Sequence, residues 1–263
     1  MIACRVLPHR IGDGPTNMAI DEALLDAVAS DPTFSVVRTY EWSVPTLSLG
    51  YFQKVGEAEA DPRWLGAATV RRPTGGGALW HDREITYAVV VPSSHPLARP
   101  STALYRAIHA SIADQLRLFG LKAERRGSDP SPPDSSALRP FLCFQDRDTD
   151  DVVVGRAKLV GSAQRRRSGA VLQHGSLLLA RSPSTPELLG VTELRIDQAS
   201  EAHHDEAHHP GHDSQSWATI LQKILPGTIG GSIFEEDLTD WERDRADILR
   251  RQTYENPSWT RRR

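Results

Sequence analysis

The sequence predicts an α+β fold for residues 1–263, taken as a single domain whose largely antiparallel sheet is flanked by helices. The expected elements follow the order helix, strands, helix, strands and helices, which lacks the strict alternation that builds a wholly parallel sheet. A length of 263 residues suits one large mixed domain. No internal repeat and no linker-like stretch divides the chain. These observations favour one continuous core.

The first expected elements are a helix and four strands. The helix begins near Thr16, because threonine is a good N-terminal cap. Its apolar face contains Ile20, Leu24, Ala27 and Val28. The strands are apolar or β-branched runs at residues 35–42, 46–51, 67–72 and 85–91. Three consecutive glycines follow the third run and end regular structure there.

A second helix is expected over residues 101–119. Its apolar residues recur at helical spacing and are Leu104, Ile108, Ile112, Leu116 and Phe119. Gly120 stands where a glycine commonly ends a helix. The spacing therefore predicts an amphipathic helix that covers one face of the sheet.

The second half of the chain is expected to hold a hairpin, two mobile loops and a helical end. Residues 127–140 are rich in Ser, Pro and Asp, which predicts the first mobile loop. The hairpin pairs residues 151–154 with 158–164 across a turn at Gly155 and Arg156. The remaining expectations are a strand at 171–179, a second mobile loop at 201–213 and a mostly helical segment at 234–254.

The bulk composition argues against several classes of function. A net charge of −3 gives no reason to expect nucleic acid as a partner. No apolar run reaches the length of a membrane span, so no membrane partner and a cytoplasmic location are expected. Two distant cysteines, Cys4 and Cys143, argue against a disulfide framework and rule out a zinc site built only from cysteines. Cys4 has no supporting context and is interpreted as structural.

The most informative segment is residues 71–87, RRPTGGGALWHDREITY. Its chemically notable residues are Arg71, Arg72, Gly75, Gly76, Gly77 and His81. Glycines expose backbone N–H groups that can hold a carboxylate or phosphate, and arginine binds the same anions through two parallel hydrogen bonds. The histidine has the chemistry to donate to a carbonyl oxygen. A tight turn with two solvated arginines is the alternative, but the combination favours a binding loop.

A second segment covers residues 155–179, GRAKLVGSAQRRRSGAVLQHGSLLL. Lys158 lies on an expected strand, where a lone lysine is more often a surface residue than a functional one. Gly161, Ser162 and Ala163 are small, which lets another group pack closely against this strand. His174, taken alone, is interpreted as a structural histidine.

These segments resemble those of a known family. RRPTGGGALWHD resembles the signature loop of the lipoate-protein ligase and octanoyltransferase family, and GRAKLVGSAQRR followed by LQHGSLLL resembles its second signature. Further segments are similar in the family's order: NMAIDEALL at 17–25, PTLSLGYFQ at 45–53 and YENPSW at 254–259. The resemblance implies a single biotin/lipoyl-synthetase-like domain in which an acyl chain lies in an apolar tunnel.

Matching positions imply roles for particular residues. The acyl-substrate-binding residues would be Arg71, Arg72, Gly75, Gly76, Gly77, His81, Gly161, Ser162 and Ala163. The catalytic residues would be Cys143 and Lys158. Lys158 would lie beside the acyl carbonyl, where its positive charge can stabilise an oxyanion.

Cys143 distinguishes two enzyme types on this scaffold. It lies in LCFQ, fifteen positions before Lys158, which resembles the cysteine placement of octanoyltransferases with a mid-chain nucleophile. We therefore predict an octanoyltransferase of protein lipoylation that carries the acyl group as a cysteine thioester and uses no cofactor. An ammonium group nearby favours the nucleophilic thiolate. The alternative for Cys143 is a small buried apolar residue.

Two alternative functions stay open. The stretch QDRDTDDVVVG after Phe144 resembles the segment that precedes the lysine in ligases. This favours an ATP-dependent lipoate-protein ligase, which would use ATP and Mg²⁺ and act through a lipoyl-adenylate. A non-catalytic protein that binds lipoyl domains is the second alternative. Both an octanoyl and a lipoyl chain suit an apolar tunnel.

The expected partners follow from the resemblance. The donor would be acyl carrier protein, and the acceptor a lipoyl domain of the glycine cleavage H protein or a dehydrogenase E2 subunit. The family's lipoyl domains present their lysine on an acidic hairpin, so residues 165–167, three arginines, are candidates for a docking face. Histidines at 203–212 have the composition of a metal site, but a solvated polar insertion is preferred and no metal is expected.

Overall fold

The computed structural model describes residues 2–127, 140–146, 148–167, 169–195 and 213–263. Within these residues, nine strands form the main sheet. Their order is β12 (Ile233–Glu235), β1 (Ala3–Val6), β3 (Phe34–Trp42), β7 (Glu84–Pro92), β11 (Ala170–Leu178), β10 (Ala157–Arg167), β9 (Val152–Val154) and β8 (Ala123–Arg125), with β2 (Arg10–Gly12) pairing with β3. The histidine-rich segment and most of the two expected loops lie outside the described residues.

The pairing within the main sheet is mostly antiparallel. Every pair from β3 through β7, β11, β10 and β9 to β8 is antiparallel, whereas β1 pairs in parallel with both β3 and β12. A second sheet orders β5 (Ala68–Arg71), β4 (Thr46–Leu49) and β6 (Leu79–His81). The predicted α+β class with a largely antiparallel sheet is confirmed, and so is the predicted hairpin of β9 and β10.

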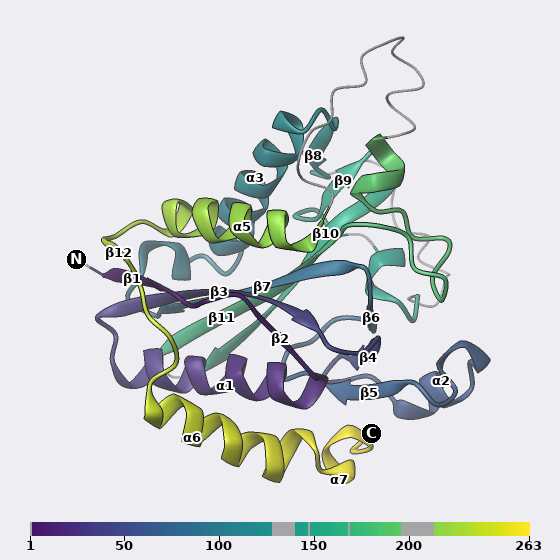
Figure 1. The fold of residues 1–263 in the computed structure, drawn as a ribbon, viewed down its shortest axis with the longest axis horizontal. Helices are drawn as coiled ribbons and strands as arrows, with labels where there is room; N and C mark the ends of the chain where they lie inside the picture. Colours follow the sequence, from purple (N-terminus) through teal and green to yellow (C-terminus); the bar gives the residue numbers. More distant parts are fainter. Residues whose placement is uncertain (1, 128–139, 147, 168, 196–212) are drawn as a thin grey trace.

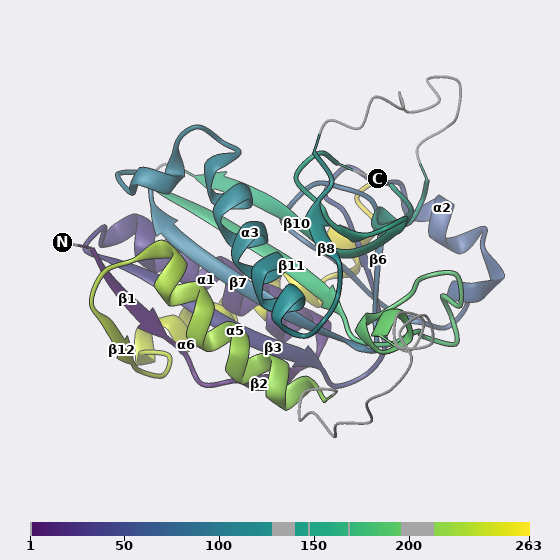
Figure 2. The ribbon, with the colours of Figure 1, turned by 90° about the horizontal axis from the view of Figure 1, so that it is seen from above.

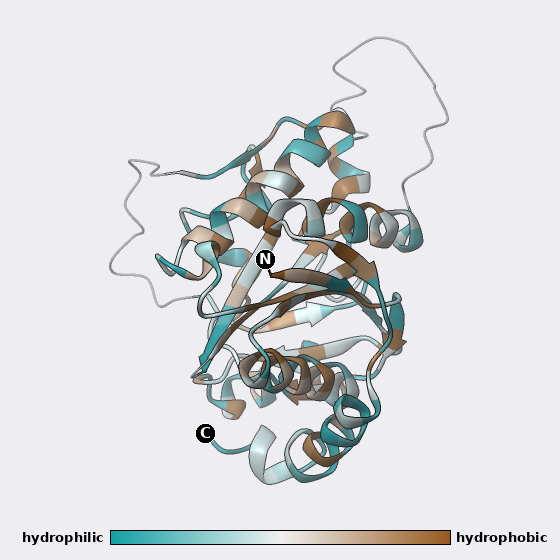
Figure 3. Cartoon of the chain, turned by 90° about the vertical axis from the view of Figure 1, so that its left-hand side faces the viewer, coloured by the Kyte–Doolittle hydropathy of each residue, from teal (hydrophilic) through white to brown (hydrophobic). Residues whose placement is uncertain are grey.

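Two helical layers cover the main sheet (Figure 1). On one face lie α1 (Gly14–Ser30) and α6 (Asp240–Leu249), and on the other lie α3 (Ala103–Leu118) and α5 (Ser214–Ile229). Figure 2 shows α3 and α5 lying over the strands of their face. Each face has its own buried apolar cluster, so the sheet separates two cores. Seen from the side in Figure 3, hydrophobic colour gathers in the strands and in α1.

Shorter elements complete the described chain. They are the helices α2 (Val55–Glu59) and α7 (Pro257–Thr260), the 3₁₀ turns η1 (Pro62–Trp64), η2 (Pro96–Ala98) and η3 (Cys143–Gln145), and the π-helical turn η4 (Arg250–Tyr254). No helix among the described residues is long and apolar enough to cross a membrane.

The boundaries differ from the sequence predictions in places. Helix α1 begins at Gly14 rather than near Thr16, because the Asp13 side chain accepts the Thr16 N–H and acts as the N-cap. Gly120 adopts φ +86° directly after the end of α3, as its predicted C-terminal role requires. The sequence analysis missed the strands β1, β2, β6, β8 and β12 and the helices α2, α5 and α7.

Candidate active site

Cys143 and Lys158 are brought together by a 3₁₀ turn and a strand of the main sheet. Cys143 begins the η3 turn, and Lys158 is the second residue of β10. The Lys158 Nζ lies 3.8 Å from the Cys143 Sγ and donates to the Cys143 carbonyl oxygen at 3.1 Å. It also forms a 2.8 Å ion pair with Asp151, the residue before β9. The predicted catalytic pair is therefore adjacent in space.

The Lys158 side chain is buried and held in one position. A Cβ built on Gly161 would lie 2.7 Å from the Lys158 Cε, so the side chain folds closely over this glycine. Burial by itself lowers the pKa of Lys158, but the negative charges of Cys143 and Asp151 outweigh it and raise the pKa above 10.5. Lys158 is therefore an ammonium ion at neutral pH.

The glycine loop, residues 75–77, packs directly against the cysteine segment, residues 141–145. The Ala78 N–H donates to the Phe141 carbonyl, and the Cys143 N–H donates to the Ala78 carbonyl, each at 2.8 Å. A Cβ on Gly77 would lie 3.0 Å from the Cys143 nitrogen, and Gly76 has φ +91°. Glycine is needed at both positions, for close approach at Gly77 and for backbone conformation at Gly76.

Arg72 holds this loop from within. Its guanidinium donates to the carbonyl oxygens of Ser48, Gly75 and Gly77 at 2.6–2.9 Å. Burial lowers the pKa of Arg72 to about 10, while the charge of Cys143 opposes this shift. Arg72 is thus a buried cation near Cys143. Among the described residues it forms no ion pair with a carboxylate.

Arg71 does not reach the acyl cavity, contrary to the sequence prediction. Its guanidinium donates to the carbonyl oxygens of Gly50 and Gln53 on one side and of Thr260 on the other. Arg71 is the last residue of β5 and Arg72 follows it, and successive side chains along an extended chain point to opposite faces, so the two arginines do not both face the site. Arg71 therefore fastens the C-terminal turn to the loop after β4.

Two hollows meet at Cys143. The first is a mostly apolar cavity, lined by Met18, Tyr40, Trp42, Ser48, Arg72, Gly76, Leu79, His81, Thr86, Cys143, Gly161, Ser162, Ala163, His174, Gly175 and Ser176. The second is a wider polar groove, lined by Phe52, Gln53, Glu57, Gly76, Gly77, Thr102, Tyr105, His109, Pro140, Cys143, Asp146, Asp148, Asp150, Asp151, Lys158 and Ser162. Gly76, Cys143 and Ser162 line both. A group bound at Cys143 is therefore accessible from an apolar side and a polar side.

The predicted binding residues are divided between these hollows. His81, Arg72, Gly161 and Ala163 line the apolar cavity, and Gly77 lines the polar groove. Gly75 lines neither, and lies in a shallow hollow beside the groove. The structure thus brings most of the predicted residues to Cys143.

His81 is fixed by two contacts. Its Nδ1 lies 2.7 Å from the Glu84 carboxylate, and its ring stacks on Trp42 with centroids 3.8 Å apart. Burial opposes ionisation of Glu84, but His81 and the Thr86 hydroxyl, among other partners, keep the pKa of Glu84 below 4.5. The carboxylate therefore accepts from Nδ1, which leaves the other ring nitrogen as the one available to a ligand.

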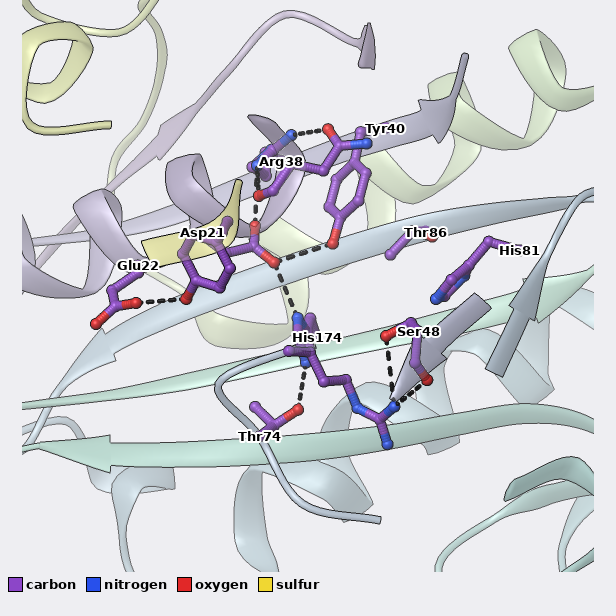
Figure 4. A network of polar contacts seen from close by, with 12 residues as sticks. Asp21, Glu22, Arg38, Tyr40, Ser48, Thr74, His81, Thr86 and His174 are labelled. Atoms are coloured by element: carbon purple, nitrogen blue, oxygen red, sulfur yellow. Dashed lines mark hydrogen bonds and ion pairs between the residues drawn. The ribbon is translucent and has the colours of Figure 1, made fainter. Parts of the chain in front are cut away.

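A buried polar network next to the cavity was missed by the sequence analysis (Figure 4). Asp21 of α1 pairs with Arg38 at 2.9 Å, and the Tyr40 hydroxyl donates to the same carboxylate at 2.9 Å. His174 bridges Asp21 and the Thr74 hydroxyl, at 2.9 and 2.7 Å. Since Thr74 immediately precedes the glycines, this network ties the loop to the helical layer. The only sequence signal was the match of NMAIDEALL, which assigned no role to Asp21.

Comparison with known sequences follows the same segments. The family profile described as the lipoyl protein ligase A/B catalytic domain matches residues 13–193. Octanoyltransferase LipM of Geobacillus kaustophilus is 43% identical over 174 residues, which cover 62% of this chain and 60% of that protein. Octanoyltransferase LipM of Kyrpidia tusciae is 42% identical over 184 residues, covering 68% and 67%. The matched part thus spans about 60% of the first relative's length.

Solved structures show a similar fold. Lipoate-protein ligase A bound with ATP superposes with a TM-score of 0.72 at 23% identity and covers 99% of each chain. A bi-partite lipoate protein ligase of Thermoplasma acidophilum gives 0.69 at 22% identity, covering 99% of this chain and 96% of that one. At these identities the likeness concerns the fold alone.

Proposed function

Because this chain belongs to the lipoyl protein ligase A/B catalytic domain family, we propose that it is an octanoyltransferase of protein lipoylation. Cys143 takes an octanoyl group from a carrier-protein thioester and passes it to a lysine of a lipoyl domain. The observation that supports this proposal most directly is the 3.8 Å distance between the Lys158 Nζ and the Cys143 Sγ. A thiol beside a buried ammonium ion, with an apolar cavity on one side, has the parts that acyl transfer requires.

In the first step the Cys143 thiolate attacks the carbonyl carbon of the octanoyl thioester. A new C–S bond forms, the old C–S bond breaks, and the carrier thiolate leaves and is protonated. The Lys158 ammonium stabilises the attacking thiolate and the oxyanion that forms on the carbonyl oxygen. Lys158 serves by charge rather than as a base, because its pKa is raised and it keeps its proton.

In the second step the lipoyl-domain lysine attacks the Cys143 thioester as a neutral amine. The C–N bond forms, the C–S bond breaks, and a proton from nitrogen passes to the sulfur. A thioester is more reactive than the amide produced, so this step needs no ATP. The octanoyl chain lies in the apolar cavity in both steps, among groups that include Met18, Trp42 and Leu79.

The relatives favour a transferase over the ligase alternative. Several proteins named octanoyltransferase LipM are about 40% identical to this chain, whereas the ligase structures are about 22% identical. Cys143 lining both hollows has a clear use in a transferase and none in an adenylate-forming ligase. The segment before β9, which resembles the corresponding segment of ligases, contains Asp151. In this structure Asp151 forms an ion pair with Lys158.

The acceptor lipoyl domain binds at a basic rim beside the polar groove. This rim consists of Arg165, Arg166, Arg262 and Arg263. Arg165 and Arg262 lie over the Tyr51 ring, and Arg263 over Phe52, a groove residue. Arg167, predicted to share in docking, instead pairs with Glu22 and Asp26 of α1. The proposed docking face therefore excludes Arg167 and includes the C-terminal arginines.

An assay of the complete transfer separates the three candidate functions. The purified protein is mixed with octanoyl-acyl carrier protein and an unmodified lipoyl domain, without ATP, and the mass of the lipoyl domain is followed. We expect the lipoyl domain to gain one octanoyl group. Modification only with free octanoate or lipoate, ATP and Mg²⁺ would identify a ligase. Binding of the lipoyl domain without modification under either condition would identify a non-catalytic binding protein.

A further inference from the structure

Two buried side chains and a half-buried serine form a chain of hydrogen bonds beside Cys143. His109 lies on α3, Ser162 on β10 and Tyr87 on β7. The Ser162 Oγ lies 2.5 Å from the His109 Nε2 and 2.5 Å from the Tyr87 hydroxyl. The His109 Nδ1 lies 2.5 Å from the Asp150 carbonyl oxygen. None of these contacts is used by the acyl-transfer steps described above.

The direction of each hydrogen bond follows from the carbonyl at one end. A carbonyl oxygen only accepts, so the His109 Nδ1 carries a proton and donates to Asp150. Burial lowers the pKa of His109 to about 4, so its Nε2 has a free lone pair at neutral pH. Ser162 must then donate its single hydrogen to this nitrogen. Tyr87 must donate to Ser162, because the serine has no second hydrogen to give.

Ser162 is thereby left as a hydrogen-bond acceptor. A serine oxygen accepts at two lone pairs, and within the described part of the chain only Tyr87 uses one of them. Ser162 lines both the apolar cavity and the polar groove, as Cys143 does. At the place where the two hollows meet, the serine therefore offers an acceptor and no donor.

Close packing around Ser162 holds the serine oxygen in this position. A Cβ on Gly175 of β11, the strand paired with β10, would lie 2.4 Å from the Ser162 Oγ and 2.7 Å from the Tyr87 hydroxyl oxygen. Any larger residue at Gly175 would displace the serine. The hydrogen bonds and this close approach together fix the position of the serine oxygen.

We propose that the Ser162 Oγ accepts a hydrogen bond from the attacking amine and orients it toward the acyl carbon on Cys143, with His109 as the residue that positions Ser162. The proposal rests on the octanoyltransferase function proposed above and concerns only its second step. An acceptor suits an N–H group, which must donate. It does not suit the acyl carbonyl oxygen, which requires a donor such as Lys158.

In this step one bond forms and one bond breaks. The amine lone pair forms the C–N bond while one N–H donates to Ser162, and the C–S bond breaks as sulfur takes the electron pair. A proton then passes from nitrogen to the Cys143 sulfur. Ser162 and His109 exchange no proton overall. A thiol attacking the same thioester has no N–H to place, so transfer to a thiol should not depend on Ser162.

This difference between an amine and a thiol gives the test. The octanoyl-enzyme is formed first, and single-turnover loss of its octanoyl group is then measured with a lipoyl domain and, separately, with pantetheine as a thiol acceptor. We expect Ser162→Ala to slow transfer to the lipoyl domain by roughly tenfold, the effect of losing one hydrogen bond. Loading of Cys143 and transfer to pantetheine should change far less.

Variants of His109 test its positioning role. His109→Ala should lower amine transfer as Ser162→Ala does, because the freed hydroxyl can then turn and donate. His109→Gln should restore much of the rate, since the amide oxygen can accept the serine hydrogen. Ser30→Ala, which removes an exposed hydroxyl at the end of α1, serves as the control.

The outcomes separate this inference from the proposed function. Normal loading with an unchanged rate of amine transfer in Ser162→Ala would overturn the role of Ser162. An equal slowing of amine and thiol transfer would also overturn it, because it would indicate a general disturbance of the site. Absence of any octanoyl adduct on the wild-type protein would instead remove the proposed function on which the inference rests.

Discussion

The cations that surround Cys143 are themselves buried. Lys158 is 7% exposed and Arg72 is 2% exposed, and both are cations close to the sulfur. Asp151 pairs with Lys158, whereas Arg72, among the residues that the structure describes, donates only to backbone carbonyls and to the Ser48 hydroxyl. A thiolate or an oxyanion at this point therefore lies near two buried cations. These two cations are the electrostatic basis of the proposed chemistry.

Removing the Lys158 ammonium should slow the loading of Cys143. We expect a loss of roughly 100- to 1,000-fold, as for the loss of one group that stabilises an oxyanion. Because the raised pKa of Lys158 lies above 10.5, the difference between wild type and variant should persist through neutral pH and disappear only as pH rises past that value. Rates of adduct formation across the pH range measure this.

The variant should be made as Lys158→Ala together with Asp151→Asn. Lys158→Ala alone leaves the Asp151 carboxylate buried without its counter-ion, at a cost to stability of about 3–5 kcal/mol. Lys223→Ala on α5, an exposed lysine, is the matched control. A double variant that loads at the wild-type rate would contradict the assigned role of Lys158.

Asp21 supports the site through its buried network rather than by contact with a substrate. Asp21→Ala leaves Arg38 buried without a counter-ion and should lower the free energy of unfolding by about 3–5 kcal/mol. Asp247→Ala removes the exposed pairs of Asp247 on α6 and should cost less than about 1 kcal/mol. Denaturant unfolding compares the two. Equal losses of unfolding free energy would show that the buried pair of Asp21 and Arg38 stabilises the fold no more than the exposed pairs of Asp247 do.

At the scale of elements, the glycine loop and the cysteine segment act as one unit. The bridge between Ala78 and Leu142 joins them, and Arg72 holds the loop carbonyls from behind. A Cβ on Gly50 would lie 2.0 Å from the Gly76 carbonyl oxygen, so the end of β4 also presses against the loop. The position of the nucleophile thus depends on contacts that only glycine allows.

Gly77→Ala should therefore misplace Cys143. Its Cβ would lie within 3.1 Å of backbone atoms of Phe141 and Cys143, which cannot rotate away. We expect loading to fall by up to about 100-fold, since a misplacement of roughly 1 Å has that effect on a positioned nucleophile. Gly75→Ala, whose Cβ meets nothing within 4 Å, should lose far less. Similar losses for the two variants would contradict the close packing at Gly77.

The strands that were predicted and those that were missed differ in a physical way. β3, β7 and β11 are nine-residue runs buried along nearly their whole length, so their apolar character is visible locally. β1, β2 and β12 have three or four residues each, and β1 pairs with β12 across the whole chain, as Cys4 with Ile233. No local pattern encodes such a pairing.

The same distinction holds within the site. Cys143 and Lys158 are close in sequence and lie in segments that resemble a known family, so their proximity could be predicted. His109 lies 53 residues from Ser162, and only the packing of α3 against the sheet brings the two together. Arg71 was assigned to the cavity because its sequence motif was considered without the alternation of a strand.

At the scale of the whole molecule, helices on both faces of the main sheet contribute to the site: Met18 of α1 lines the apolar cavity and His109 of α3 lines the polar groove. Helices α1 and α6 pack on one face, where Asp21 anchors the network that reaches the glycine loop. The cysteine segment and the polar groove lie along the edge formed by β8, β9 and β10, where α3 contributes His109 (Figure 2). The basic rim borders this groove.

Charge reversal at the rim should weaken binding of the lipoyl domain as the acyl acceptor. Arg165→Glu with Arg262→Glu should raise the KM for this acidic acceptor and reduce the dependence of the rate on salt, because steering by opposite charges is lost. Loading of Cys143 by a small octanoyl thioester should be unaffected. Steady-state rates at several salt concentrations measure this.

The control carries the same change of charge elsewhere. Arg10→Glu with Arg243→Glu reverses two exposed arginines that both pair with Asp237, away from the groove. This control should leave the KM for the lipoyl domain near that of the wild type. A rim variant that behaves like the control would contradict the proposed docking face.

The central claim is that Cys143 carries the octanoyl group. Its most direct test is the intact mass of the protein after incubation with octanoyl-acyl carrier protein and no ATP, with Cys143→Ala in parallel. The account predicts a gain of one octanoyl group that hydroxylamine removes and that the variant lacks. An unmodified protein, with ATP-dependent acylation of a lipoyl domain by both wild type and Cys143→Ala, would contradict it and identify a ligase whose Cys143 serves only in packing.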